Sequence, residues 1–494
     1  MSPPAWFSKK EHQTGGLAVA SERKNASLAS MVSLSRTHLT ALIVASMLFM
    51  EQLDGTILST ALPAIANSLH VDTVATSVAL TAYIVGLAIF IPASGALADR
   101  LGSRTVLSGA IVMFVLCSVA CASAHSLLFL ACMRTLQGIG GALMVPVGRL
   151  VVLRSTPREE LVRTMTWMML PATLGPLLGP VVGGFITTYL SWRWNFYLNI
   201  PVGIVGLLLT RLFIPEVKAE HPPPFDLRGL VFAGGGLAIL SIVAELFSHN
   251  QGTHTLLLAL LLIGCALMGI YGLHAHSLAA PLLDFRLFKT STFRISVLGG
   301  AASRIAVGAF PFLLPTFLQI GTGLTAAQSG MITFCAPVGA IAMRPFVPAI
   351  LRKWGFRRVL IANGFSAGLL AALIACYHAG QPLWPLTLIL LAAGMAQSIQ
   401  FSAYNTIAYA DISATRMSAA TSLYATMQQL MLSLGICIAA GTLTFSCQFN
   451  ARTQPIAHDF MVAFLVVGFI SFLAAPISTR LKPNAEAALS GKKG

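Results

Sequence analysis

Residues 95–104 read GALADRLGSR, which places an aspartate and two arginines between two long apolar runs, 75–98 and 104–124. Each run is long enough to cross the roughly 30 Å of hydrocarbon in a bilayer as a helix. A short charged connector between two such runs is typical of a loop that joins two membrane spans. Because the rest of the chain repeats this pattern, the stretch predicts the fold class.

The composition of the whole chain agrees with a membrane protein. Of its 494 residues, 56% are hydrophobic and only 10% are charged, whereas soluble domains carry about 25% charged residues. Apolar runs of about 20 residues recur with short polar breaks, and we count about fourteen of them. We therefore expect an all-α polytopic membrane protein. The expected spans are 39–62, 75–98, 104–124, 127–150, 165–190, 196–214, 228–247, 254–275, 294–318, 327–350, 358–378, 383–407, 418–443 and 459–478.

Lysine and arginine residues near the span ends alternate between two sets of loops. Sixteen of them lie on one set, while only two, Arg193 and Arg452, lie on the other. The positive-inside rule places the richer set in the cytoplasm, so we expect both termini there and a bacterial inner membrane around the spans. Attraction to anionic lipid accounts for the net charge of +15. No nucleic-acid partner is therefore expected.

An internal repeat indicates how the spans are grouped. LADRLGSRTVL at 97–107 aligns with ILRKWGFRRVL at 350–360, which pairs Gly102 with Gly355. Each segment lies between the second and third spans of a six-span half, and many transporters consist of such duplicated halves. The predicted domains are a cytoplasmic tail at 1–38, a six-helix half at 39–214, a linker with two inserted transmembrane helices at 215–280, a second six-helix half at 281–478 and a cytoplasmic tail at 479–494.

Five motifs together resemble the major facilitator superfamily, and within it the fourteen-helix drug:proton antiporter branch of the EmrB/QacA type. They are LDGTILSTALPAI at 53–65, GALADRLGSR at 95–104, RTLQGIGGA at 134–142, GPLLGPVVGG at 175–184 and WRWNFYLNIPVG at 192–203. The resemblance implies a major facilitator fold of two six-helix halves plus two inserted helices. It also implies alternating access, with a small-molecule substrate exchanged for protons and no cofactor. Periplasmic adaptor proteins are candidate partners.

The resemblance implies a cytoplasmic gate in the loop at 95–104, which braces the outward-open state. The residues in the expected places are Gly95, Asp99, Arg100, Gly102 and Arg104. Because a charge at a buried helix end needs a partner, we expect Asp99 to pair with an arginine or to cap a neighbouring helix. The alternative is that the arginines only mark the cytoplasmic side.

Two further motifs lie within helices. By resemblance, Arg134, Gln137 and Gly138 belong to the fourth-helix motif, in which Arg134 takes part in proton relay. The fifth-helix antiporter motif comprises Gly175, Gly179, Pro180, Gly183 and Gly184. Because small residues allow close helix approach and proline weakens a helix, we expect a kinked face that packs against the other half and seals the cavity against proton leak. Generic helix packing is the alternative.

Ionisable residues deep inside spans cost about 2.5–3.5 kcal/mol each, so they are candidates for function. Glu51 and Asp54 are three residues apart and share a helix face. Two carboxylates held close in low dielectric cannot both ionise cheaply, so we expect at least one to carry a proton. Asp54, which lies in the first-helix motif, is the first candidate for this titrating group and Glu51 is the second. The alternative is a fixed ion pair with Arg134. We expect Arg304 to attract an anionic substrate group, or to pair with Glu51 or Asp54 across the halves.

The sequence therefore predicts a proton-coupled exporter of small amphipathic or drug-like compounds, and not an enzyme. The eight cysteines show no metal-binding spacing, so no metal site is expected. No phosphate-binding loop of the G-x-x-x-x-G-K-[ST] type occurs, which argues against ATP as the energy source. The alternatives are a proton-coupled carrier for a specific metabolite, and a membrane sensor or cofactor-binding membrane protein that transports nothing.

Overall fold

The structure is a computed structural model, and it describes residues 39–481 except 157–160, 217, 219–224, 279–280, 379 and 414–415. Every regular element in the described residues is a helix, and thirteen of these helices are long and apolar enough to span a membrane. A further helix, α6 (Leu161–Tyr189), contains the shorter apolar stretch Leu174–Tyr189. The predicted all-α polytopic membrane fold is confirmed. The predicted terminal tails lie outside the described residues, except for 479–481.

The helices begin and end close to the predicted spans. The first span is Leu39–Thr60. It is followed by α2 (Leu62–Leu69), α3 (Val78–Leu101), α4 (Ser103–Ala122), α5 (Leu127–Ser155), α6, α7 (Trp194–Tyr197), α8 (Asn199–Phe213), α9 (Leu227–Ser248), α10 (His254–Ser277), α11 (Ser291–Thr316), α12 (Ala326–Thr333), α13 (Cys335–Met343), α14 (Val347–Trp354), α15 (Phe356–Ala375), α16 (Leu383–Ala408), α17 (Met417–Phe449), α18 (Ala457–Phe472) and α19 (Ala474–Ser478).

Three predicted spans are interrupted at a point that a proline explains. The breaks fall between α7 and α8, between α12 and α13, and between α18 and α19. Pro201, Pro337 and Pro476 each lie three residues beyond a break, and each lacks the N–H that would bond to the carbonyl four residues earlier. The span expected at 327–350 ends earlier than predicted, since α13 stops at Met343, shortly before Pro345, and the apolar stretch long enough to cross a membrane is Ala326–Met343.

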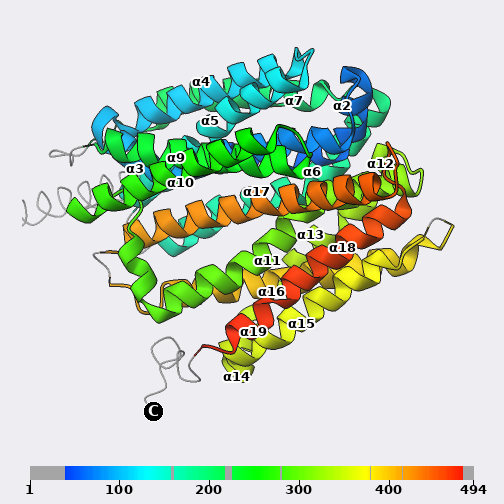
Figure 1. Ribbon diagram of the computed structural model, residues 1–494. Coiled ribbons are helices and arrows are strands. Elements are labelled where there is room, and N and C mark those ends of the chain that lie inside the picture. The colour runs from blue at the N-terminus through cyan, green and yellow to red at the C-terminus, as the bar shows by residue number, and fades with distance from the viewer. Residues whose placement is uncertain are drawn as a thin grey trace, which may run out of the picture.

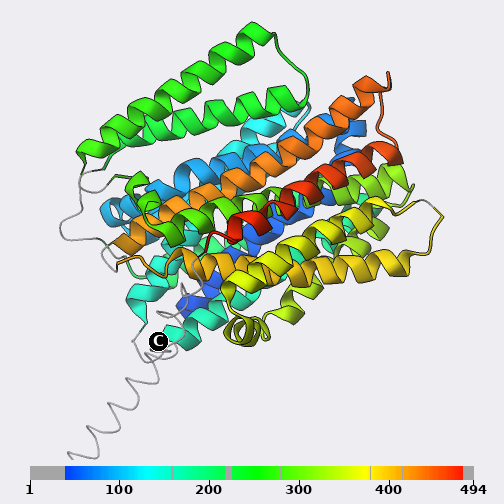
Figure 2. The same cartoon turned by 60° about the horizontal axis from the view of Figure 1, so that its bottom comes forward.

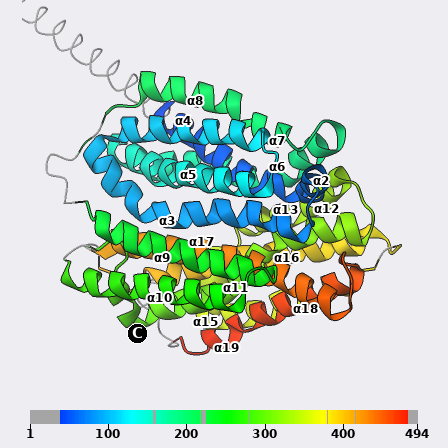
Figure 3. The ribbon, with the colours of Figure 1, turned by 45° about the horizontal axis from the view of Figure 1, so that its top comes forward.

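The helices pack in two layers, which Figures 1 and 3 show from two directions. The elements from the first span to α8 form one layer and those from α11 to α19 form the other, with α3 packed against α17 between them. We name the end that holds the α3–α4 turn the Gly102 end, and the opposite end, where the first span stops, the Thr60 end. The α14–α15 turn and α19 also lie at the Gly102 end (Figure 1).

The two layers are joined at the Thr60 end. The Nε2 atom of Gln319 donates a hydrogen bond to the carbonyl oxygen of Thr60 at 3.0 Å. The backbone N–H of Ala327 donates to Oγ1 of Thr188, also at 3.0 Å. A Cβ atom on Gly184 would collide with the carbonyl oxygen of Ala326. Helices α6 and α12 therefore hold the layers in close contact at this end.

Helices α9 and α10 form a hairpin at the outer edge of the bundle (Figure 2). Asp226 joins its two arms, since its carboxylate caps α9 through the Gly229 N–H at 2.7 Å and contacts Nε2 of His274 at 2.8 Å. α9 packs against both α3 and α17, whereas few residues of α10 are buried. The hairpin therefore touches both layers along one helix.

Candidate functional site

A buried polar network surrounds Asp54, which lies in the first span and is 1% exposed. Its Oδ2 atom contacts Nη1 of Arg134 at 2.5 Å. Its Oδ1 atom accepts hydrogen bonds from Nε2 of Gln137 at 3.0 Å and from Nδ2 of Asn199 at 2.6 Å. The first span, α5 and α8 each contribute to the network, so Asp54 is held as a paired and fully hydrogen-bonded carboxylate.

Arg134 on α5 is completely buried and is fixed from several sides. Its Nε atom donates to the carbonyl oxygen of Ala79 at 3.0 Å, and Nη1 also donates to Oε1 of Gln137 at 2.9 Å. The guanidinium lies over the Tyr83 ring, 4.3 Å from the centroid, at a distance typical of a cation–π contact. Its Nη2 atom has no hydrogen-bond partner among the described residues. The two N–H groups of this atom are therefore not used by the described residues.

Glu51 lies about one helical turn before Asp54 and is equally secluded, with 5% exposure. Its Oε1 atom accepts from the Tyr83 hydroxyl at 3.3 Å, and its Oε2 atom accepts from Nε2 of Gln52 at 2.6 Å. Within the described part of the chain it forms no ion pair. The fixed ion pair with Arg134, which we gave as the alternative to proton binding, is therefore formed by Asp54 and not by Glu51.

The remaining fourth-helix residues have separate structural effects. Gln137 completes the network, since its Nε2 atom also contacts Oγ of Ser118 at 3.3 Å. Gly138 lets α5 approach α3, because a Cβ atom there would collide with the carbonyl oxygen of Tyr83. Gln137 thus bonds directly to Asp54. Gly138 allows a close backbone contact with Tyr83, whose ring covers Arg134.

The loop predicted as a gate is stabilised by a residue that the sequence analysis missed. Glu216, which follows α8, accepts from the Arg104 N–H at 3.1 Å and from Oγ1 of Thr105 at 2.8 Å. It thereby supplies a negative charge at the N-terminus of α4. Asp99 is half-buried near the end of α3, while Gly95 and Arg100 are exposed.

The glycines aligned by the internal repeat share a backbone conformation. Gly102 has φ 94° and ψ 142° between α3 and α4, and Gly355 has φ 80° and ψ 151° between α14 and α15. The N–H of each donates to a carbonyl oxygen four residues earlier at 3.0 Å. A positive φ favours glycine, so this conformation explains why both copies carry it.

The glycines of the fifth-helix motif pack mainly against a helix of their own layer. Cβ atoms on Gly175, Gly179 and Gly183 would collide with Leu53, Thr56 and Ile57 of the first span, respectively. The prediction that this face packs against the other half was wrong for these three residues. It is correct for Gly184, which contacts α12, and the Pro180 carbonyl lies against Gly330 of that helix. The motif therefore brings α6 close to the span that carries Asp54.

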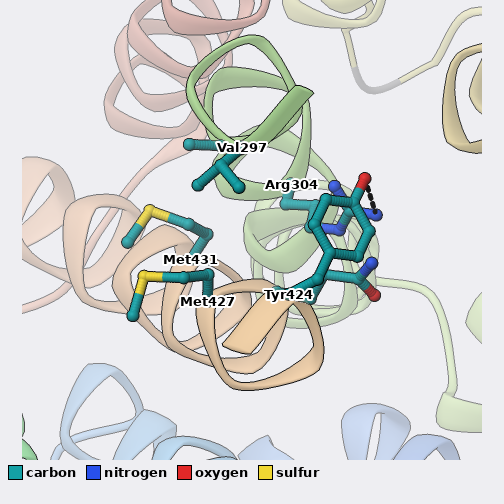
Figure 4. A pocket seen from close by; sticks show the side chains of 7 residues that line it. Val297, Arg304, Tyr424, Met427 and Met431 are labelled. Atoms are coloured by element: carbon teal, nitrogen blue, oxygen red, sulfur yellow. Dashed lines mark hydrogen bonds between the residues drawn. The ribbon is translucent and has the colours of Figure 1, made fainter. Parts of the chain in front are cut away.

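Arg304 lies on α11, away from both acids. Its Nη2 atom contacts Oδ1 of Asn405 at 3.4 Å and the Tyr424 hydroxyl at 3.5 Å. The predicted pairing with Glu51 or Asp54 does not occur in this structure. The guanidinium instead faces a small cavity between α11 and α17 (Figure 4).

Three other polar residues escaped the sequence analysis as site residues. Asn199 was quoted only as part of the WRWNFYLNIPVG motif, yet its amide reaches Asp54. Glu245 of α9 accepts from Oγ1 of Thr81 at 3.0 Å and from Sγ of Cys437 at 3.3 Å. It therefore links the α9–α10 hairpin to both layers. Arg149 of α5 is exposed although it lies inside a span.

The described residues contain no group of three potential metal ligands.

Comparisons with known proteins agree with this architecture. A sequence model described as Major Facilitator Superfamily matches residues 44–436. The chain is 38% identical over 445 residues to the protein named "Putative multidrug resistance protein MdtD" of Salmonella heidelberg (strain SL476), covering 90% of this chain and 94% of that one. The protein of the same name from Salmonella paratyphi A (strain ATCC 9150 / SARB42) matches with the same identity and coverage.

Solved structures show the same fold at low sequence identity. A crystal structure of the nucleoside transporter NupG aligns with a TM-score of 0.63 and 15% identity, covering 89% of this chain and 99% of that one. The POT family transporter PepTSo aligns with a TM-score of 0.68 and 13% identity, covering 89% and 97% of the two chains. These similarities extend over the two layers and establish the fold independently of the motifs.

Proposed function

Because the chain belongs to the major facilitator superfamily of membrane transporters, we propose that it exports small amphipathic or drug-like compounds in exchange for protons by alternating access. The relatives named as multidrug resistance proteins support this substrate class. The observation that carries the proton coupling is the pair of buried carboxyl groups, of which Asp54 has a cationic partner and Glu51 has none.

The unequal partners of the two acids favour Glu51 as the proton carrier. Ionised Glu51 would be a buried charge without a counter-charge, which is costly. The protonated form can remain between Tyr83 and Gln52, and the proton is released when the site opens to water. Ionised Asp54 is stabilised by Arg134 and two amides, so we assign it the structural role of holding Arg134 in place beside the carrier.

The orientation and the domain plan belong to the same proposal. We place the Gly102 end in the cytoplasm and the protein in a bacterial inner membrane, with both termini cytoplasmic, because the lysine- and arginine-rich loops lie at that end. The plan of six helices, two inserted helices and six helices is supported by the matching Gly102 and Gly355 turns and by the peripheral α9–α10 hairpin. A periplasmic adaptor as partner stays a prediction.

The predicted gate is also part of this proposal. In this orientation the 95–104 loop lies at the cytoplasmic end, where Glu216 ties it to the segment after α8. The layers are joined at the Thr60 end, which supports a conformation closed toward the outside. The loop would then brace the layers in the alternate, outward-open conformation, through Asp99, Arg100 and Arg104.

The test is compound-driven proton movement in everted membrane vesicles with an acidified lumen. We would add a lipophilic cation, a neutral drug and an organic anion to vesicles that contain wild type, Glu51→Gln, Asp54→Asn or the control Arg211→Gln, which alters an exposed residue of α8. We expect proton release from wild type and from the control, and none from Glu51→Gln. Release that persists in Glu51→Gln and disappears in Asp54→Asn would transfer the carrier role to Asp54. Failure of folded wild type with every compound would overturn the proposed antiport.

A further inference from the structure

Arg304 is a buried cation without a carboxylate partner in the described part of the chain. It is 5% exposed, and its two contacts with Asn405 and Tyr424 are long, at 3.4 and 3.5 Å. Its Nε atom has no hydrogen-bond partner among the described residues. Burying a guanidinium whose N–H groups are not all hydrogen-bonded costs free energy. A binding partner from outside these residues would offset that cost.

The surroundings of Arg304 combine one polar side with one apolar side. Its guanidinium lies 5.0 Å from the Phe401 ring centroid and 5.1 Å from that of Tyr424. Figure 4 shows Met427 and Met431 of α17 facing the same cavity beside Val297. Methionine adapts to apolar groups of different shapes. The cavity thus offers a cation at one side and an adaptable apolar wall at the other.

Arg304 is the one charged side chain among the described residues that line this cavity, and none of them is acidic. An anion that reaches the cavity therefore meets a cation, whereas a second cation would be repelled.

We propose that Arg304 binds the anionic group of the transported substrate, and that the substrate class is organic anions with an aromatic or aliphatic body. A carboxylate would accept from the guanidinium fork, with its apolar part against Met427 and Met431. The cavity, of about 10 Å³, has room for about one water molecule and is far smaller than typical ligand sites, so α11 and α17 have to move before the carboxylate reaches Arg304. This inference rests on the proposed function and specifies its substrate.

The test compares three probes that share one ring system and differ in charge. They are 2-naphthoate, neutral 2-naphthamide and cationic (2-naphthylmethyl)trimethylammonium, and their equilibrium binding is measured on the full chain in lipid nanodiscs. We expect wild type to bind the carboxylate at least about tenfold more tightly than the amide, since a hydrogen bond to a charged group is worth roughly 1.5–3 kcal/mol. Equal affinities, or a preference for the cation, would overturn the inference without requiring any variant.

Two variants of Arg304 and one control variant then locate the binding group. Arg304→Gln is expected to remove the preference for 2-naphthoate over 2-naphthamide, Arg304→Lys to retain part of it, and Arg211→Gln to leave it unchanged. An unchanged preference in folded Arg304→Gln would overturn the assignment to Arg304. The proposed function is judged separately in the vesicle assay: cation-driven proton release combined with no naphthoate binding would leave antiport standing and reject the anion site.

Discussion

At the scale of single residues, the two buried acids differ in what holds them. Asp54 shares a charge pair with Arg134, while Glu51 contacts only uncharged groups. Removing one member of a buried ion pair leaves the other charge uncompensated, which is far more costly than removing a hydrogen-bonded neutral acid. Replacing Asp54 should therefore destabilise the protein far more than replacing Glu51. This difference can be measured without a transport assay.

We predict that Asp54→Asn lowers the free energy of unfolding by about 3–5 kcal/mol, because it leaves Arg134 buried without a counter-charge. Glu51→Gln should change it by less than about 1 kcal/mol, since the amide can still bond to Tyr83 and Gln52. Thermal unfolding of the purified variants in one detergent measures both effects. Equal destabilisation by the two substitutions would contradict the assigned pairing.

Glu216 gives a prediction about pH. Burial alone would raise its pKa, but the hydrogen bonds from Thr105 and from the Arg104 N–H, together with the Arg104 charge, outweigh burial and hold the pKa below the ordinary value of 4.5. Because the folded-state pKa is depressed, the stabilisation is present above that ordinary value and is lost as pH falls through the folded-state pKa. It is therefore expected to be intact at neutral pH.

The measurement is the melting temperature of wild type minus that of Glu216→Gln, recorded between neutral pH and the acid side of pH 4.5. We expect wild type to melt higher at neutral pH and the difference to shrink on acidification. A difference that grows as pH falls would show that the ionised carboxylate does not stabilise the α4 N-terminus.

At the scale of helices, the glycine face of α6 determines how closely it approaches the first span. A Cβ atom on Gly183 would collide with the Ile57 carbonyl oxygen, whereas Gly109 on α4 has no atom within 4 Å of a Cβ position. Gly183→Ala should cost about 1–3 kcal/mol of stability through overpacking. Gly109→Ala, the matched control, should be neutral or stabilising by up to about 1 kcal/mol. Similar unfolding midpoints for the two alanine variants would refute the close packing.

At the scale of the whole molecule, alternating access requires the layers to separate at the Thr60 end, where Thr188 contacts Ala327. We predict that Thr188→Cys and Ala327→Cys, joined by a short bis-methanethiosulfonate cross-linker that attaches through reducible disulfides, arrest transport because α6 and α12 can no longer part. Reductive cleavage of the linker should restore flux. Each single-cysteine variant treated in the same way is the control for the chain's eight native cysteines, and full activity of the cross-linked pair would rule out opening at this end.

Much of the fold follows from the sequence because its causes are local. Apolar length determines where each span lies. The breaks before Pro201, Pro337 and Pro476 each coincide with a missing N–H, but Pro92, Pro146 and Pro311 lie inside unbroken helices. Only the tertiary structure therefore shows which prolines interrupt a span. The motifs identified the glycine turn at Gly102 and the residues Asp54, Arg134 and Gln137.

The sequence by itself determined the class of protein, its spans and the buried charges Glu51, Asp54, Arg134 and Arg304, since burial in a membrane depends on the polarity of each segment. It did not single out Asp284 and Asp459, which are also buried. Only the tertiary structure decided which residues pair with these charges. Arg134 pairs with Asp54 across 80 residues and Asn199 reaches it across 145, while Glu216 bonds to the N-terminus of α4 across 112. Short-range rules of helix geometry do not extend over such separations, because which side chains meet depends on how whole helices pack.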